Sequence, residues 1–141
     1  MPGAGVRNPE DIINLTMKSD EGLSDYGLLL KLAESGATVV KTTDVTDTWV
    51  AVGVDNTKDA TTGTVQDGAP IGAQIAGVVP IKAIAGTYRK WDKIYTAQTA
   101  EADGHVKNSS AASAVRVGTY VGPDNTVYVT GDHIEVLLIP L

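Results

Sequence analysis

The sequence predicts an all-β protein built from short strands and tight turns. Valine and threonine account for 17 and 16 of the 141 residues, whereas phenylalanine is absent and aromatic residues make up only 5%. β-Branched side chains lose little freedom on a pleated sheet and more in a helix, so this composition favours strands. The 15 glycines and 6 prolines are spread between the apolar segments, where they suit turns. We expect one domain, a small β-barrel or sandwich.

The first 25 residues differ from the remainder and predict an N-terminal arm, residues 1–25, ahead of a β-domain at 26–141. Residues 8–11 have the order of a helix start: an asparagine cap, a proline at the first helical position and two acids. A helix of one or two turns is marginal in water, so this short helical or extended arm must dock on its own domain or on a partner. The candidate contact residues of the arm are Val6, Arg7, Ile12, Ile13, Leu15 and Met17.

From Tyr26 onward the apolar residues recur with the period of two that is typical of strands. Turn residues separate the strands, and three neighbouring pairs are expected: 27–32 with 37–43, 70–75 with 78–83, and 93–97 with 105–107. Pro140 ends the last strand because it cannot donate to a ladder. The other predicted strands are 49–54, 115–121, 127–130 and 134–139.

Charge and composition exclude several classes of protein. The chain carries a formal charge of −6, and its densest basic cluster, at residues 89–93, is interrupted by Trp91 and Asp92, so it offers no basic stripe for a nucleic-acid backbone. There is no cysteine, which excludes disulfides and thiolate chemistry. The apolar runs are too short for a bilayer, and the N-terminus lacks the features of a signal peptide. We expect synthesis in the cytoplasm, with neither nucleic acid nor membrane as a partner.

Patterns that partly match chemical sites fail on inspection. Residues 55–59 begin like a calcium loop, but Ala60 stands where the turn glycine is required and Gln66 where a bidentate glutamate should close the site. His105 and His133 lie beside turns, where both are expected to face water, and neither has a second ligand at strand or helix spacing. No serine has the spacing of a nucleophile elbow. We therefore expect no catalytic residue, no cofactor and no metal ion.

The two tryptophans receive different interpretations. Trp49 belongs to an alternating strand and is expected in the core. Trp91 lies between Lys90 and Asp92, with Tyr88 and Tyr95 nearby. An aromatic residue with charged neighbours is a common interface anchor, so Tyr88, Trp91 and Tyr95 are candidate anchors; the alternative is that Trp91 caps the end of a barrel.

Five short motifs in the second half of the chain are built around turns. They are Ala76-Gly77-Val78-Val79, Trp91-Asp92-Lys93-Ile94, Ala102-Asp103-Gly104-His105-Val106, Arg116-Val117-Gly118-Thr119 and Gly131-Asp132-His133-Ile134-Glu135-Val136. In this order they resemble the small capsid decoration (cement) proteins of tailed double-stranded DNA viruses, and most closely the family usually encoded beside the major capsid protein. The resemblance covers about half of the chain. Trp91 departs from it, because the family usually has glycine before that aspartate, and residues 1–25 have no counterpart.

The resemblance implies a tulip-like β-barrel that forms a homotrimer on threefold and quasi-threefold positions of the viral shell. Its partner would be the major capsid protein, contacted in part by the N-terminal arm, and its location the outer surface of the virion. Such a protein stabilises the shell against the pressure of packed DNA, because binding favours the state that is bound.

Three alternatives remain open at this point. Another virion protein, associated with a tail or fibre, would have the same composition. A carbohydrate-binding β-module would need an exposed aromatic platform, which only Trp91 with Tyr88 or Tyr95 could supply. A hydrolase of unfamiliar type would need a catalytic constellation, which the sequence does not offer.

Overall fold

The computed structural model describes residues 15–19, 26–33, 38–56, 70–97, 101–110 and 113–139, with the backbone alone for 15–19, 54–56 and 70. These residues contain strands and no helix, which confirms the all-β prediction. The strands are β1 (Leu15–Ser19), β2 (Leu29–Leu32), β3 (Thr38–Lys41), β4 (Ala51–Asn56), β5 (Pro70–Gln74), β6 (Val78–Lys82), β7 (Gly86–Tyr88), β8 (Lys93–Thr96), β9 (Val106–Lys107), β10 (Arg116–Tyr120), β11 (Thr126–Tyr128) and β12 (His133–Leu138).

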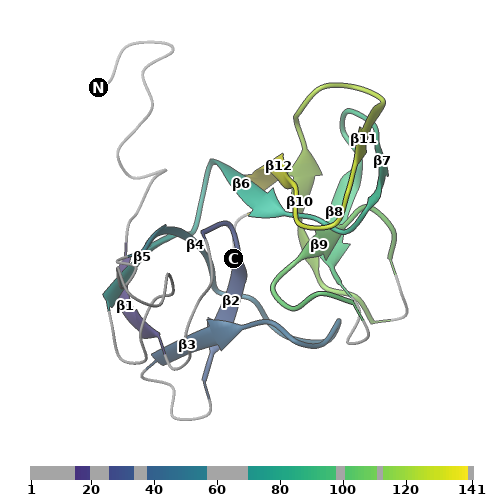
Figure 1. Cartoon of the computed structure of the whole chain (residues 1–141). Coiled ribbons are helices and arrows are strands. Elements are labelled where there is room, and N and C mark those ends of the chain that lie inside the picture. Colours follow the sequence, from purple (N-terminus) through teal and green to yellow (C-terminus); the bar gives the residue numbers. More distant parts are fainter. Residues whose placement is uncertain are drawn as a thin grey trace, which may run out of the picture.

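The first sheet holds the five N-terminal strands in the order β1-β3-β2-β4-β5, and β5 pairs back with β1, so the pairings close on themselves (Figure 1). The β1–β3 pair is parallel and the others are antiparallel. A small apolar cluster belongs to this sheet, with Leu28, Leu30, Val39 and Ile71 buried. The predicted hairpin of 27–32 with 37–43 is confirmed as β2 and β3.

The second sheet has the order β6-β12-β10-β8-β9 and is antiparallel throughout. β12 shows why these residues form a strand with one wet face: Ile134, Val136 and Leu138 are buried, whereas Glu135 and Leu137 between them are exposed. The predicted pair of 93–97 with 105–107 is confirmed as β8 and β9. A separate two-stranded ribbon, β7 with β11, lies at the side of this sheet remote from β1 (Figure 1).

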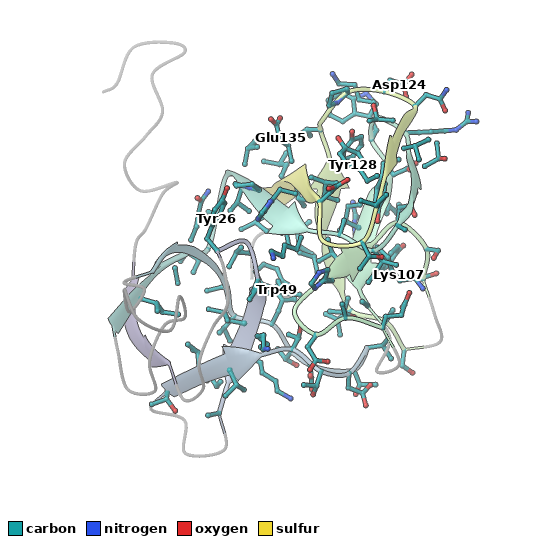
Figure 2. The ribbon with its side chains drawn as sticks, in the orientation of Figure 1. Tyr26, Trp49, Lys107, Asp124, Tyr128 and Glu135 are labelled. Atoms are coloured by element: carbon teal, nitrogen blue, oxygen red, sulfur yellow. The ribbon has the colours of Figure 1, made fainter. Side chains whose placement is uncertain are left out.

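The main core joins the two sheets. Trp49 is buried between them and its indole Nε1–H donates to the Arg116 carbonyl at 3.1 Å, which confirms the predicted core position (Figure 2). Backbone bonds cross the same junction, from Leu29 N–H to the Gly104 carbonyl and from Lys82 N–H to the Gly27 carbonyl, each at 2.8 Å. Residues of both sheets share one cluster, so burial on each stabilises the other.

One pairing of the fold was predicted incorrectly, and one strand was missed. Residues 70–75 and 78–83 form strands but do not pair: β5 pairs with β1 and β4, and β6 pairs with β12, so the bend at Ala76-Gly77 carries the chain between sheets. Of the two conformations predicted for the arm, Leu15 and Met17 adopt the extended one, in β1 of the first sheet. The ribbon strand β7 was not predicted at all.

Candidate interaction surface

A cluster of three tyrosines fixes the ribbon to the second sheet. The rings of Tyr88 and Tyr120 lie 5.6 Å apart between centres, and the Tyr128 ring packs edge-on against both. Tyr120 Oη is 2.6 Å from the Pro123 carbonyl and 2.9 Å from Tyr128 Oη, and Tyr88 Oη donates to the Ile84 carbonyl at 2.7 Å. Burial raises the pKa of Tyr120 to about 12, helped by the bond to Tyr128. The cluster is a desolvated, hydrogen-bonded joint, so it holds the ribbon in one position.

The turn between β7 and β8 is fastened by two aspartates. Asp92 accepts hydrogen bonds from the Arg89 N–H at 2.9 Å and from Asn108 Nδ2 at 3.0 Å. Asp124, in the turn between β10 and β11, accepts a hydrogen bond from the Lys90 N–H at 3.0 Å (Figure 2). Since both carboxylates bond to groups within the molecule, they order the turn instead of presenting a free acidic pair to solvent.

Trp91 is held in a left-handed backbone conformation in this turn, with φ of 74°. Its N–H donates to the Tyr120 carbonyl at 2.9 Å, and the Tyr120 N–H donates to the Asp92 carbonyl at 2.8 Å. A residue with a Cβ loses about 1–2 kcal/mol in this conformation relative to the right-handed one. Trp91 is nevertheless 66% exposed. Strain that persists at an exposed aromatic residue is typical of a binding surface.

The outward side of the ribbon is apolar. Val127 is 73% exposed and Val129 64% exposed, although valine is usually buried. Thr87 stands opposite Val127 in the register, and Arg89 follows on the same side because Tyr88 points inward. We call this surface, with Thr87, Arg89, Val127 and Val129, the ribbon face.

The three candidate anchors differ in their exposure in the folded chain. Trp91 is exposed and Tyr95 is half-buried, but Tyr88 is only 1% exposed, so its assignment as a surface anchor was wrong. The sequence placed Tyr88 in a polar stretch, and only Tyr120 and Tyr128, distant in the chain, bury it. Tyr88 is therefore lost from the aromatic platform that a carbohydrate-binding module would need.

The two histidines do not simply face water, as was expected of them. His105 is buried and its Nδ1–H donates to the Asp103 carbonyl at 2.8 Å. Burial lowers the pKa of His105, and the charge of Lys82 acts in the same direction. His133 stacks on Tyr26 with ring centres 4.6 Å apart, and its Nε2–H donates to the Tyr26 carbonyl at 3.1 Å. The His133 ring thus contacts Tyr26, which precedes the first strand of the β2–β3 pair, whereas the His105 ring bonds within its own turn.

The remaining sequence predictions concern residues that the structure does not describe. Val6, Arg7, Ile12 and Ile13 of the arm, residues 57–66 of the rejected calcium loop and Pro140 lie outside the described residues. Within the described ranges, no group of three or more histidine, aspartate or glutamate side chains could hold a metal ion. The same ranges contain no helix that could span a membrane.

Val127 and Val129 are the surface residues that sequence reasoning missed. Both sit in a segment read as an ordinary strand between two turns. A signal was present, because the segment 126–130 alternates threonine and tyrosine with valine, but alternation does not reveal which of the two sides is buried.

Comparison of the chain with models of known protein families finds no match, and comparison with curated proteins finds no similar protein.

Proposed function

We propose that this chain is a capsid decoration protein, which binds the outer surface of a viral shell as a homotrimer and stabilises it by adhesion. Its partner is the major capsid protein, and the work it performs is binding and not catalysis. Repetition of a modest contact over many equivalent sites gives a large total stabilisation of the assembled state.

The observation that carries this proposal is where the five resembling motifs lie. Each falls on a different strand of the second sheet: they lead into or form β6, β8, β9, β10 and β12 in turn. Their turn positions Gly77, Trp91, Gly104 and Gly131 all have positive φ. Chance matches would not be expected to fall one on each strand of the same sheet. They would also not be expected to place a residue with positive φ in four of the five motifs. The motifs therefore specify a sheet, and their regular placement supports the resemblance on which the proposal rests.

The exposed side chains also support binding to a partner as the function. The ribbon face and Trp91 expose apolar area, and the nearby carboxylates of Asp92 and Asp124 accept hydrogen bonds from the turn itself. Isolated exposed apolar residues are common, but an exposed aromatic residue in a strained turn, together with two exposed valines on the adjoining ribbon, favours a contact surface.

The test is binding of the purified full chain to shells assembled from the major capsid protein of the virus that encodes it. We expect the chain to cosediment with the shells and to raise the temperature at which they rupture. Tails purified from the same virus serve as the control. Cosedimentation with tails and not with shells, or with neither, would contradict the proposal.

A deletion tests the contribution of the arm. Removal of residues 1–20 is unsuitable because it also removes β1 from the first sheet. A chain that lacks residues 2–14 keeps β1, and we expect it to fold but to bind shells at least about tenfold more weakly. Unchanged affinity would show that the arm residues Val6, Arg7, Ile12 and Ile13 do not contact the shell.

A further inference from the structure

Most sheet edges in the described part of the chain are covered. Each of the five strands of the first sheet pairs with a neighbour on both sides. In the second sheet β9 is an edge strand, where Val106 bridges to Ala83 and its carbonyl accepts a hydrogen bond from the Ile84 N–H at 2.9 Å. Exposed edges are templates for pairing with other chains, so natural proteins usually cover or interrupt them.

β6, at the opposite edge of the second sheet, cannot pair with a further strand along its length. The Lys82 N–H donates to the Gly27 carbonyl at 2.8 Å, and the Val78 carbonyl accepts from Gln74 Nε2 at 3.0 Å. Pro80 lies between them and has no N–H to donate. Both edges of the second sheet are therefore closed.

The ribbon has one covered edge and one open edge. The Thr87 carbonyl of β7 accepts from Asn108 Nδ2 at 2.9 Å, so the main chain of Thr87 faces away from β11. Thr87 and Val127 are register partners, and such partners in an antiparallel pair either exchange both hydrogen bonds or exchange neither. The N–H and C=O of Val127 therefore face away from β7, toward the free edge of β11.

No described residue bonds to the main chain of Val127. Val129, the next residue with the same orientation, already uses both of its groups: its N–H donates to the Asp132 carboxylate at 2.9 Å, and its carbonyl accepts from the Asp132 N–H at 3.0 Å. The open edge is thus short and centred on Val127. Beside it lie the exposed side chains of Val127 and Val129, so unpaired main-chain groups and apolar area occur together.

We propose that the open edge of β11 receives an extended segment of a partner protein, which pairs with the main chain of Val127 and adds a third strand to the ribbon. Addition of a strand to a sheet edge gains affinity from main-chain hydrogen bonds and specificity from alternate side chains. Apolar side chains on the ribbon-face side of the added strand would cover Val127 and Val129. This contact deepens the proposed function, on which it rests for the identity of the partner, the major capsid protein.

The ribbon is ready for such a strand before the partner arrives. Tyr128 of β11 packs edge-on against Tyr88 and Tyr120, which holds the strand in its extended form (Figure 2 labels Tyr128). Little conformational freedom is therefore lost on binding. A ribbon of two strands is only marginally stable by itself, so a third strand also stabilises the ribbon.

The charges at one end of β11 favour an acidic segment. Arg89 and Lys90 are exposed next to the Thr126 end of the strand, and no described carboxylate forms an ion pair with either. The carboxylates of Asp92 and Asp124 accept hydrogen bonds from N–H groups of the turn. Charges farther away than about 8 Å are screened at physiological ionic strength, so these cations act on the segment more strongly than the net charge of −6 does.

Two substitutions at one position separate the main chain from the side chain. Val127→Pro removes the N–H that faces the open edge and leaves the β7–β11 hydrogen bonds in place. We expect the full-length variant to bind shells of the major capsid protein at least about tenfold more weakly, because a carbonyl of the added strand loses its donor. Val127→Thr is the matched control, since it keeps the N–H and the β-branched shape, and it should bind within about threefold of the wild type. Circular dichroism and urea unfolding show that both variants are folded.

Hydrogen exchange measures the pairing directly. The Val127 amide should exchange rapidly in the free chain and at least about tenfold more slowly on shells. The Tyr128 amide, which faces β7, is the internal control and should be protected in both states.

Overlapping synthetic peptides that span the major capsid protein identify the added strand. A peptide that binds the full chain should lose affinity when it is N-methylated at the amide that faces Val127, and should keep it when the next amide is methylated. Exchange of its carboxylates for amides should also weaken binding.

Three outcomes overturn the inference. They are wild-type binding of Val127→Pro to shells, a Val127 amide that exchanges equally fast on shells, and a wild type whose sedimentation shows a second copy of this chain at the edge, released by Val127→Pro. Any of these with intact binding to shells would leave the proposed function standing. Peptide binding that depends on the Val127 N–H, without binding to assembled shells, would keep the inference and refute the proposed function.

Discussion

Replacement of Trp91 by glycine and by alanine gives two variants that differ only in the cost of the left-handed backbone. Both lose the same indole, so whatever Trp91 contributes by packing cancels in the comparison. With φ at 74°, alanine keeps a Cβ strain of about 1–2 kcal/mol, from which glycine is free. Glycine has the more flexible unfolded chain, which offsets about 0.4–1 kcal/mol of this advantage. We expect Trp91→Gly to be more stable than Trp91→Ala by up to about 1.6 kcal/mol, with a midpoint of about 0.8 kcal/mol.

Urea unfolding measures the difference directly, because the midpoint shifts in proportion to stability when the slope is unchanged. Lys90 supplies the control, since it is exposed in the same turn and is not among the described residues with positive φ. There the order should reverse, with Lys90→Ala more stable than Lys90→Gly by about 0.5–1 kcal/mol. If Trp91→Ala equals or exceeds Trp91→Gly in stability, the turn is not strained and the argument that strain marks a binding surface fails.

Three further predictions concern the interior. Gly118→Ala should cost more than about 2 kcal/mol in urea unfolding, because its Cβ would overlap the backbone carbonyl oxygen of Leu137. Gly53→Ala should cost less, because the nearest atom to its Cβ would be 3.7 Å away; equal losses would contradict the packing argument. The pKa of His105 is lower in the folded protein than in the unfolded chain, so the stability present above about pH 6.5 should be lost as the pH falls below about 6.5. His105→Asn should reduce this pH dependence of the unfolding free energy. An unaltered pH profile in the variant would rule out His105 as its source. Tyr120→Phe should lower the free energy of unfolding by about 1–2 kcal/mol at neutral pH, because the hydrogen bonds of the hydroxyl are lost. The wild type should lose stability as the pH rises from about 10 to about 12, and the variant should lose less. An identical alkaline profile in the variant would count against the raised pKa of Tyr120.

The elements that were predicted correctly are those whose own residues carry the signal. β12 alternates buried and exposed side chains along its length, and the β2–β3 and β8–β9 pairs are joined by short connections with turn residues. In each case a local pattern agrees with the final environment. Where the local pattern agrees with the final environment, the secondary structure can be predicted from the sequence alone.

The failures occur where partners distant in the chain decide the structure. The bend at Ala76-Gly77 has the residues of a hairpin turn, and Gln74 Nε2 closes it by donating to the Ala76 and Val78 carbonyls. The same bend can also carry the chain from one sheet to the other. The burial of Val79 and Ile81 in the main core favours this crossover over a hairpin. Tyr88 is a similar case, because its burial depends on Tyr120 and Tyr128.

The departures from ordinary residue preference lie mainly at the surface of the described part of the chain. Among the described side chains, Thr38 Oγ1 is the single buried polar atom without a hydrogen-bond partner, so the described interior is almost fully hydrogen-bonded. Trp91 has a left-handed backbone at an exposed position, and Val127 and Val129 are exposed to water. Natural chains that break local rules tend to do so where they function. A partner that covers these three residues would remove their apolar area from water.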